Sequence, residues 1–327
     1  MGDPMGNAEA PASWEFAVAP PRSAPGVASM VGYRALDVPD TPHLGLPSAS
    51  LTFIVSLDDG VEAAETAEAL ADARPNPVVL GGLHVAASHV RQRPGQAGVQ
   101  LAVHPLASRA LFGVPSAELS VRDFDGLTVL GARAAELRER VAEATGWREA
   151  FGLVADHLVD ARRHRADRRS AAVRPELAHA WHLLERSRGR SPVGAVAERV
   201  GLSARHLTTL FRREVGRSPK TVARLMRFEH TTARIAGTAR RGERTDLAAV
   251  AAACGYSDQP HLTHEFVRFT GLPPRAWLAR EFRNLQDGGF GDWSEWAHDT
   301  HAPQDRSDRD DPHHVSDPGR LADPAGG

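Results

Sequence analysis

The chain has 327 residues, 42% of them apolar, and a formal net charge of −2. This length and apolar content allow a sizeable core, and they favour two domains with flanking tails over a disordered protein. The sequence has no apolar run long enough to span a membrane and begins without the segments of a signal peptide, so we expect a cytoplasmic protein with no membrane partner. The single cysteine, Cys254, excludes an internal disulfide and disfavours a zinc site.

Short β-like segments fill the first part of the chain. Residues 1–12 are rich in Gly, Pro and Ala, and we expect them to be disordered. Segments such as SLTFIVSL and GVQLAVHPL follow, bounded by Gly, Pro and Asp-Gly, as is typical of strands. They predict a β-rich, barrel-like domain over residues 13–165 that ends in helices.

The helical end of this domain is predicted from a change of period. Apolar residues recur at helical spacing at Leu137, Val141, Trp147, Phe151, Val154 and Leu158. The pattern indicates a helical hairpin that turns at Gly146. Its apolar stripe suits either the core of the same chain, the commoner case, or contact with a second subunit.

The charge distribution separates the rest of the chain into a basic block and an acidic tail. Residues 174–283 hold 20 basic and 10 acidic side chains, whereas residues 285–327 hold 3 and 10. We expect an Arg-rich linker at 166–173, a helical domain at 174–285 and a mostly disordered acidic tail at 286–327. A basic domain in a nearly neutral protein favours a nucleic-acid partner, although a solvated charged face is the simpler alternative.

An internal repeat decides between these alternatives. The segment VGAVAERVGLSARHLTTLFRREVGRSPK, residues 193–220, is similar to LAAVAAACGYSDQPHLTHEFVRFTGLPPR, residues 247–275. Ala197, Gly201 and Ser203 align with Ala251, Gly255 and Ser257 at an offset of 54, and after one extra residue the offset becomes 55. Repetition of this length points to a duplicated structural unit.

Each copy has the pattern of a helix-turn-helix motif. A small alanine suits a helix crossing, a glycine suits a turn with positive φ, and a polar cap opens a second helix whose Leu and Phe share one face. In such motifs the second helix enters the major groove of DNA. The predicted core residues are Ala197, Gly201, Leu207, Phe211, Ala251, Gly255, Leu262 and Phe266.

The opposite face of each second helix supplies candidate contacts with double-stranded promoter DNA. Arg suits guanine, Gln suits adenine, and Thr can offer a hydroxyl or a methyl group. The base-reading candidates are Arg205, Thr208, Thr209, Arg212, Gln259, Thr263 and His264. The phosphate-binding candidates are Arg213, Lys220, Arg268 and Arg275. A solvated helix residue is the alternative at each single position.

The histidines and the cysteine give little support for a metal or catalytic site. His261 and His264 could share one helix face, but Cys254 precedes the turn and no further ligand cluster is evident. Four N-terminal histidines are scattered over some sixty residues without a close His-x-His pair, namely His43, His84, His89 and His104. We expect no metal, no cofactor and no catalytic residue.

The C-terminal residues resemble the AraC/XylS transcription regulators. The match covers residues 175–283, contains both half-motifs and the helix between them, and ends in Gly271, Pro273, Pro274 and a short closing helix. The resemblance implies a seven-helix domain whose recognition helices lie about one DNA turn, roughly 34 Å, apart. Pro260 departs from the pattern; it is tolerated in a first helical turn but makes a base contact there less expected.

The sequence thus predicts an α+β fold, in which the β-rich, barrel-like domain with its hairpin precedes an all-α double helix-turn-helix domain. The leading hypothesis is a DNA-binding transcription regulator that is not an enzyme. In this hypothesis the N-terminal domain senses a small-molecule effector or forms a homodimer, and RNA polymerase is a further candidate partner. The alternative hypothesis is a metal-dependent or DNA-repair enzyme in the N-terminal barrel, delivered by the DNA-binding helices.

Overall fold

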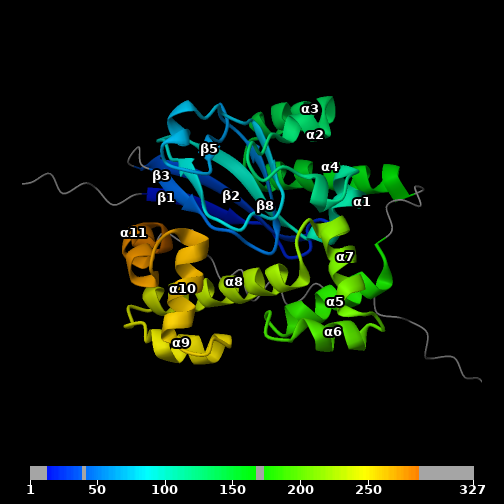
Figure 1. Cartoon of the computed structure of the whole chain (residues 1–327). Helices are drawn as coiled ribbons and strands as arrows, with labels where there is room; N and C mark the ends of the chain where they lie inside the picture. Colours follow the sequence, from blue (N-terminus) through cyan, green and yellow to red (C-terminus); the bar gives the residue numbers. More distant parts are fainter. Residues whose placement is uncertain (1–12, 39–41, 167–172, 287–327) are drawn as a thin grey trace, which may run out of the picture.

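The computed structural model describes residues 13–38, 42–166 and 173–286. The predicted N-terminal disorder, the linker and the acidic tail lie almost wholly outside these ranges. A β-rich half is followed by a helical half, so the chain has the predicted α+β fold (Figure 1). No helix of the described part combines the length and the apolar character needed to span a bilayer.

The N-terminal half contains two antiparallel sheets. The larger sheet has the strand order β1-β2-β8-β4-β6 and the smaller has the order β3-β7-β5. Their strands are β1 (Ser13–Val18), β2 (Val27–Asp37), β3 (Pro42–Gly45), β4 (Leu51–Ser56), β5 (Ala63–Ala64), β6 (Val78–Gly81), β7 (Ser88–Arg91) and β8 (Ala97–Val103). Within the described residues these pairings do not close into a barrel, so the domain is barrel-like only in a loose sense.

Alternation along the strands gives the larger sheet two different faces. In β4, Leu51, Phe53 and Val55 belong to the main hydrophobic core. Their neighbours Thr52 and Ile54 point to the other side and line a cavity. Because successive strand residues face opposite sides, one strand can build both the core and the cavity wall.

Four helices follow the sheets, and the predicted hairpin is among them. They are α1 (Ser108–Phe112), α2 (Gly126–Leu130), α3 (Ala132–Ala142) and α4 (Trp147–Ala166). Gly146 lies in the turn between α3 and α4, as expected. Leu137, Val141, Phe151, Val154 and Leu158 are all buried in the core of the same chain. The stripe is therefore intramolecular packing, and a second subunit would have to use another surface.

The C-terminal half is helical throughout. Its helices are α5 (Pro175–Arg186), α6 (Val193–Arg199), α7 (Ala204–Val215), α8 (Pro219–Arg240), α9 (Leu247–Cys254), α10 (Gln259–Thr270) and α11 (Pro274–Gln286). The long helix α8 carries a buried face along its whole length, from Val222 near its start to Ala239 in its last turn.

The two halves are joined by polar contacts at both ends of the helical domain. Near α7, Arg109 Nε lies 2.5 Å from Glu214 Oε1, and Arg217 Nε donates to the carbonyl of Leu83 at 2.7 Å. Near α11, His43 Nδ1 lies 2.9 Å from Glu281 Oε2. These contacts hold the helical domain against the sheets.

Candidate DNA interface and the cavity behind it

Helices α6 and α7 form the first helix-turn-helix unit. Gly201 has φ 72° at the turn, a conformation that favours glycine. The Ser203 side chain then accepts a hydrogen bond from the His206 amide and caps α7. Ala197, Leu207 and Phe211 are at most 1% exposed, which places them in the core between the two helices.

Helices α9 and α10 form the second unit on the same plan. Gly255 has φ 78°, and Ala251, Leu262 and Phe266 are at most 1% exposed. The cap of α10 is Asp258, whose Oδ1 accepts from the His261 amide at 2.7 Å. The repeat had paired Ser203 with Ser257; the extra turn residue moves the capping position on by one.

The predicted base-reading side chains lie on the outer faces of α7 and α10. Arg205, Thr209, Arg212, Gln259 and His264 are exposed, and Thr208 and Thr263 are partly exposed. The predicted phosphate contacts are all exposed as well, at Arg213, Lys220, Arg268 and Arg275. None of these side chains is used in the protein core, so both outer faces are available to a ligand.

Hydrogen bonds within α7 restrict what its threonines can offer. Thr208 Oγ1 donates to the carbonyl of Ala204 at 2.8 Å, and Thr209 Oγ1 donates to that of Arg205 at 3.1 Å. Their hydroxyl protons are thus engaged in the helix. At a base edge each threonine presents an acceptor lone pair and a methyl group, and the charged donors on this face are the arginines.

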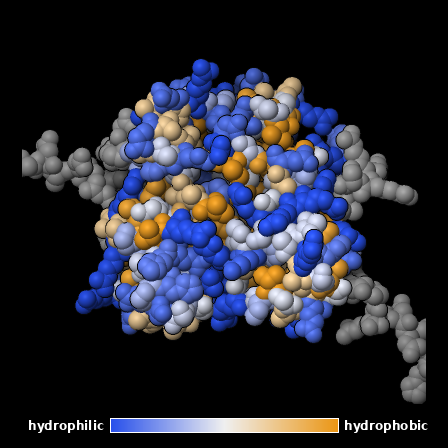
Figure 2. All heavy atoms as spheres, viewed as in Figure 1, coloured by the Kyte–Doolittle hydropathy of each residue, from blue (hydrophilic) through white to orange (hydrophobic). Residues whose placement is uncertain are grey.

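The long helix α8 sets the spacing of the two units. Figure 1 shows α7 and α10 on either side of the length of α8, with α6 and α9 beside them at the bottom of the view. With 22 residues and a rise of about 1.5 Å per residue, α8 is about 33 Å long. In the same view, Figure 2 shows many hydrophilic side chains over α9 and α10.

A buried ionic network ties α10 to α8. Glu265 is 5% exposed. Its Oε1 accepts from Arg224 Nε at 2.5 Å, and its Oε2 accepts from Arg227 Nη2 at 2.9 Å. Sequence reasoning missed these residues, although Glu265 aligns with the apolar Leu210 at the offset of 55. An acidic residue at a core position of the repeat was the available signal.

Several of the described histidines make contacts within the protein. His261 Nδ1 lies 3.1 Å from Ser257 Oγ, and His43 pairs with Glu281. His104 is partly buried, and its ring centroid lies 5.0 Å from that of Trp181. Burial lowers the pKa of His104 to about 4, so this ring is neutral near pH 7.

The described ranges contain no cluster of three or more His, Cys, Asp or Glu able to hold a metal. Cys254 is a buried free thiol, and burial raises its pKa. Because the thiolate is the reactive form of cysteine, this environment makes Cys254 a poor nucleophile.

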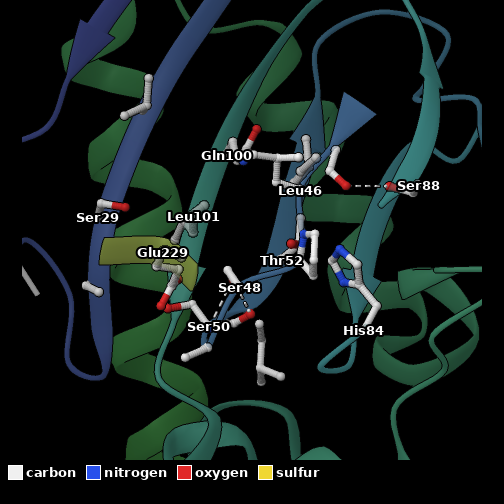
Figure 3. A pocket seen from close by; sticks show the side chains of 18 of the residues that line it. Ser29, Leu46, Ser48, Ser50, Thr52, His84, Ser88, Gln100, Leu101 and Glu229 are labelled. Carbon is white, nitrogen blue, oxygen red and sulfur yellow. Dashed lines mark hydrogen bonds between the residues drawn. The ribbon is translucent and has the colours of Figure 1, made fainter. Parts of the chain in front are cut away.

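Behind the candidate DNA interface lies a cavity of about 460 Å³. The larger sheet supplies one wall, with Ser29, Thr52 and Gln100, and α5 and α8 supply another, with Glu185 and Glu229. Figure 3 shows Glu229 extending from α8 into the cavity beside the segment that carries Ser48 and Ser50. The cavity therefore contacts both halves of the chain.

Both cavity glutamates have raised pKa values. Burial raises the pKa of Glu185 to about 7. Burial is also the main reason why the pKa of Glu229 rises to about 7; the amide of Ala49 opposes the rise and the charge of Glu185 adds to it. Near pH 7, the cavity thus holds two carboxyl groups that are each partly protonated.

A comparison with protein-family models matches residues 196–280 to a helix-turn-helix domain family. Residues 196–280 form an AraC-type helix-turn-helix domain. The match spans both helix-turn-helix units and the helix α8 between them, and it supports a DNA-binding transcription regulator.

The chain is similar to solved structures, two of which follow. An AraC-type transcriptional regulator from Chromobacterium violaceum is 24% identical, over 32% of this chain and 91% of its own, with a TM-score of 0.28. ToxT from Vibrio cholerae is 9% identical, over 84% of this chain and 99% of its own, with a TM-score of 0.44. A comparison with curated proteins gives no match.

Proposed function

We propose that this AraC-type regulator binds a promoter site through α7 and α10, and that a small molecule in the cavity controls the binding. The AraC-type match favours this hypothesis over a metal-dependent or DNA-repair enzyme. One observation carries the regulatory part: a single cavity is lined by the N-terminal sheet and by α5 and α8 of the DNA-binding half.

The proposed DNA contacts fall into two classes. Those that read bases are Arg205, Thr208, Thr209, Arg212, Gln259, Thr263 and His264; those that bind phosphates are Arg213, Lys220, Arg268 and Arg275. Exposure of all of them on α7, α8, α10 and α11 supports the division. Base contacts specify a sequence, whereas phosphate contacts add affinity for any duplex.

A binding experiment separates these two classes. A preferred site is first selected from random duplexes with the full chain. Arg205→Ala is expected to weaken binding to that site by about 1–3 kcal/mol while binding to random DNA changes little. Lys220→Ala is expected to weaken both about equally and to reduce the salt dependence of binding. Equal losses on both DNAs for Arg205→Ala would contradict the base-reading role.

The proposed path from the cavity to DNA passes through one aromatic pair. Trp181 of α5 lines the cavity, and its ring stacks on that of Phe211 in α7 with centroids 6.2 Å apart. A ligand that touches Trp181 is thus one side chain away from the recognition helix. Such a ligand can shift DNA affinity only by binding more tightly to one arrangement of this contact than to another.

Screening the full chain against a metabolite library by thermal shift tests the sensor role. A ligand at 100 times its dissociation constant stabilises the folded protein by about 2.7 kcal/mol. Cross-linking on bound DNA tests for a second copy of the chain or for RNA polymerase. A library without any stabilising compound, together with DNA affinity that no compound alters, would remove the sensor role.

We further propose that residues 13–165 and 174–285 are separate domains joined at 166–173. The change from strands to helices in the described residues supports this division. Limited proteolysis is expected to cut first in the joining segment and to leave two fragments. First cuts within either domain would contradict these boundaries.

A further inference from the structure

A pair of carboxylic acids lies in the wall of the cavity. Glu185 lies on α5 and Glu229 on α8, and both line the cavity. Within the described residues neither carboxylate forms an ion pair. The hydrogen bond from the Ala49 amide favours the charged form of Glu229 and so limits the rise of its pKa. Two partly buried acids without a neighbouring cation are costly to ionise, so a cation beside them would stabilise their charged forms.

The basic groups of the cavity do not supply that balance. Arg188 is the one arginine among its lining residues; its Nη1 donates to His230 Nε2 at 3.1 Å, and its charge is not among the causes that shift the pKa of Glu185 or Glu229. Burial lowers the pKa of His104 to about 4, and burial also lowers that of His84. His43 lies beside Glu281 instead. The two glutamates therefore dominate the charge that a bound molecule would meet.

Two further polar groups of the cavity lining are deeply buried and unsatisfied. Ser29 is 9% exposed, and its Oγ has no hydrogen-bond partner. Trp181 is 3% exposed, and its indole N–H is also without a partner. Since buried polar groups are nearly always hydrogen-bonded, an unpaired acceptor and an unpaired donor beside a cavity point to a ligand that would meet them.

The remaining lining favours a ligand with an apolar body. Val31, Ile54 and Val79 line the cavity from the sheet, and Met226 lines it from α8. Apolar walls with a few polar groups are typical of small-molecule sites. The acidic pair sits at the helical wall, so the charged end of a bound molecule would lie next to the DNA-binding half.

We infer that the cavity binds an organic ammonium compound with an apolar body, whose cationic nitrogen lies between Glu185 and Glu229. This inference rests on the proposed function for its regulatory consequence, since binding itself needs only the cavity. The ammonium group donates hydrogen bonds to both carboxylates, and the Ser29 hydroxyl is a further acceptor. The ligand's apolar part fills the space against the sheet.

Binding of a cation changes the protonation of the two acids. Both have pKa values raised to about 7, and a cation favours their ionised form. At pH 7, binding is therefore expected to release on the order of one proton per site. A neutral or anionic ligand would release none.

Three probes with one indole skeleton test the charge requirement. Tryptamine is cationic, tryptophol is neutral and indole-3-propanoate is anionic near pH 7; hexylammonium serves as an aliphatic cation. Isothermal titration with the full chain, in two buffers of different ionisation enthalpy, measures both affinity and proton release. At least one cationic probe is expected to bind ten or more times tighter than the neutral and anionic probes, with proton release.

Matched variants assign the binding to the acidic pair. Glu185→Gln and Glu229→Gln are each expected to weaken binding of the cationic probe tenfold or more. Glu198→Gln changes an exposed glutamate of α6 and is expected to leave it unchanged. Circular dichroism and DNA binding of each variant report whether it folds, and the double variant Glu185→Gln/Glu229→Gln provides a second reading with the same expected loss.

Several outcomes would overturn the inference. They are tighter binding of indole-3-propanoate than of any cation, unchanged cation binding in both single variants, or no binding of any cationic probe at millimolar concentration. DNA binding by the same samples is measured separately. Specific DNA binding without any binding of cations removes this inference and leaves the proposed regulator intact, whereas loss of specific DNA binding removes the proposed function itself.

Discussion

Leu210 in the first recognition helix and Glu265 in the second occupy equivalent positions of the repeat, and both are buried. The first unit completes its core with an apolar side chain and with the Trp181–Phe211 stack. The second unit places a carboxylate there and surrounds it with Arg224 and Arg227 of α8. One backbone plan is thus held by hydrophobic packing in one copy and by a buried ionic network in the other.

The difference between the copies has a functional counterpart. The first unit contacts the cavity through Trp181, whereas the second is anchored to α8. A ligand in the cavity is therefore expected to affect the first unit more directly. We therefore expect one adjustable and one fixed recognition helix.

The largest effect is expected from removing the buried acid of the second unit. Glu265→Ala leaves Arg224 and Arg227 without their shared partner, and breaking a buried pair in this way costs about 3–5 kcal/mol. Chemical denaturation of the full chain measures the change. Glu198→Ala on the exposed face of α6 is the control and is expected to stay within about 0.5 kcal/mol. A loss below about 1 kcal/mol for Glu265→Ala would show that the network does not hold the second unit.

The next largest effect is expected from the two cavity glutamates, whose contribution to stability depends on pH. A carboxyl whose pKa is higher in the folded than in the unfolded protein favours folding when protonated. Stability is therefore lost as pH rises from about 4.5 to about 7, the values for Glu185 and Glu229. At pH 8, Glu185→Gln and Glu229→Gln are each expected to raise the free energy of unfolding by on the order of 2–3 kcal/mol. At pH 4 they are expected to match the parent chain.

Denaturation curves at these two pH values check that expectation. Glu243→Gln is a suitable control, because Glu243 is exposed and its pKa is lowered by Arg241. Destabilisation of both cavity variants at pH 8 would mean that the ionised carboxylates are stabilised in the fold.

Changes of base-reading residues separate the two half-sites. Arg205→Ala is expected to cost about 1–3 kcal/mol and to relax sequence preference only in the half bound by α7; Gln259→Ala is expected to do the same only in the half bound by α10. Binding to a set of singly substituted sites measures both. Loss of preference at the same base pairs in both variants would contradict two separate recognition helices.

The smallest effect is expected at the contact between the halves. Arg109 is partly exposed, so Arg109→Ala should remove only about 1–2 kcal/mol through its pair with Glu214. The buried Glu214 sits near the end of α7, and any change in DNA binding should therefore appear at the first half-site. Denaturation and the same substituted sites provide the measurement. An equal effect on both half-sites would argue against separate control of the first unit.

The sequence predicts the helical half well because the same turn and core positions occur in both copies of the repeat. Gly201 and Gly255 mark the turns, and the apolar spacing marks the buried faces. The repeat misplaces one detail, since Asp258 rather than Ser257 caps α10. That choice depends on the conformation of an inserted residue, which the alignment does not contain.

Features that depend on distant residues escape sequence reasoning. Glu265 meets Arg224 across 41 positions, and Glu185 and Glu229 converge because α5 and α8 pack against each other beside the cavity. The strands were expected from short β-like segments bounded by turn residues, but their division into two sheets follows from long-range pairing. Periodicity specifies which face of an element is buried; it does not specify what that face meets.

The central claim is that α7 and α10 enter successive major grooves on one face of a straight duplex. Methylation interference of guanine N7, with the full chain on its selected site, tests this claim most directly. The account predicts two major-groove patches about 10 base pairs apart in which methylation blocks binding, with Arg205→Ala removing the interference in only one of them. A single patch, or two patches on opposite faces of the duplex, would contradict it.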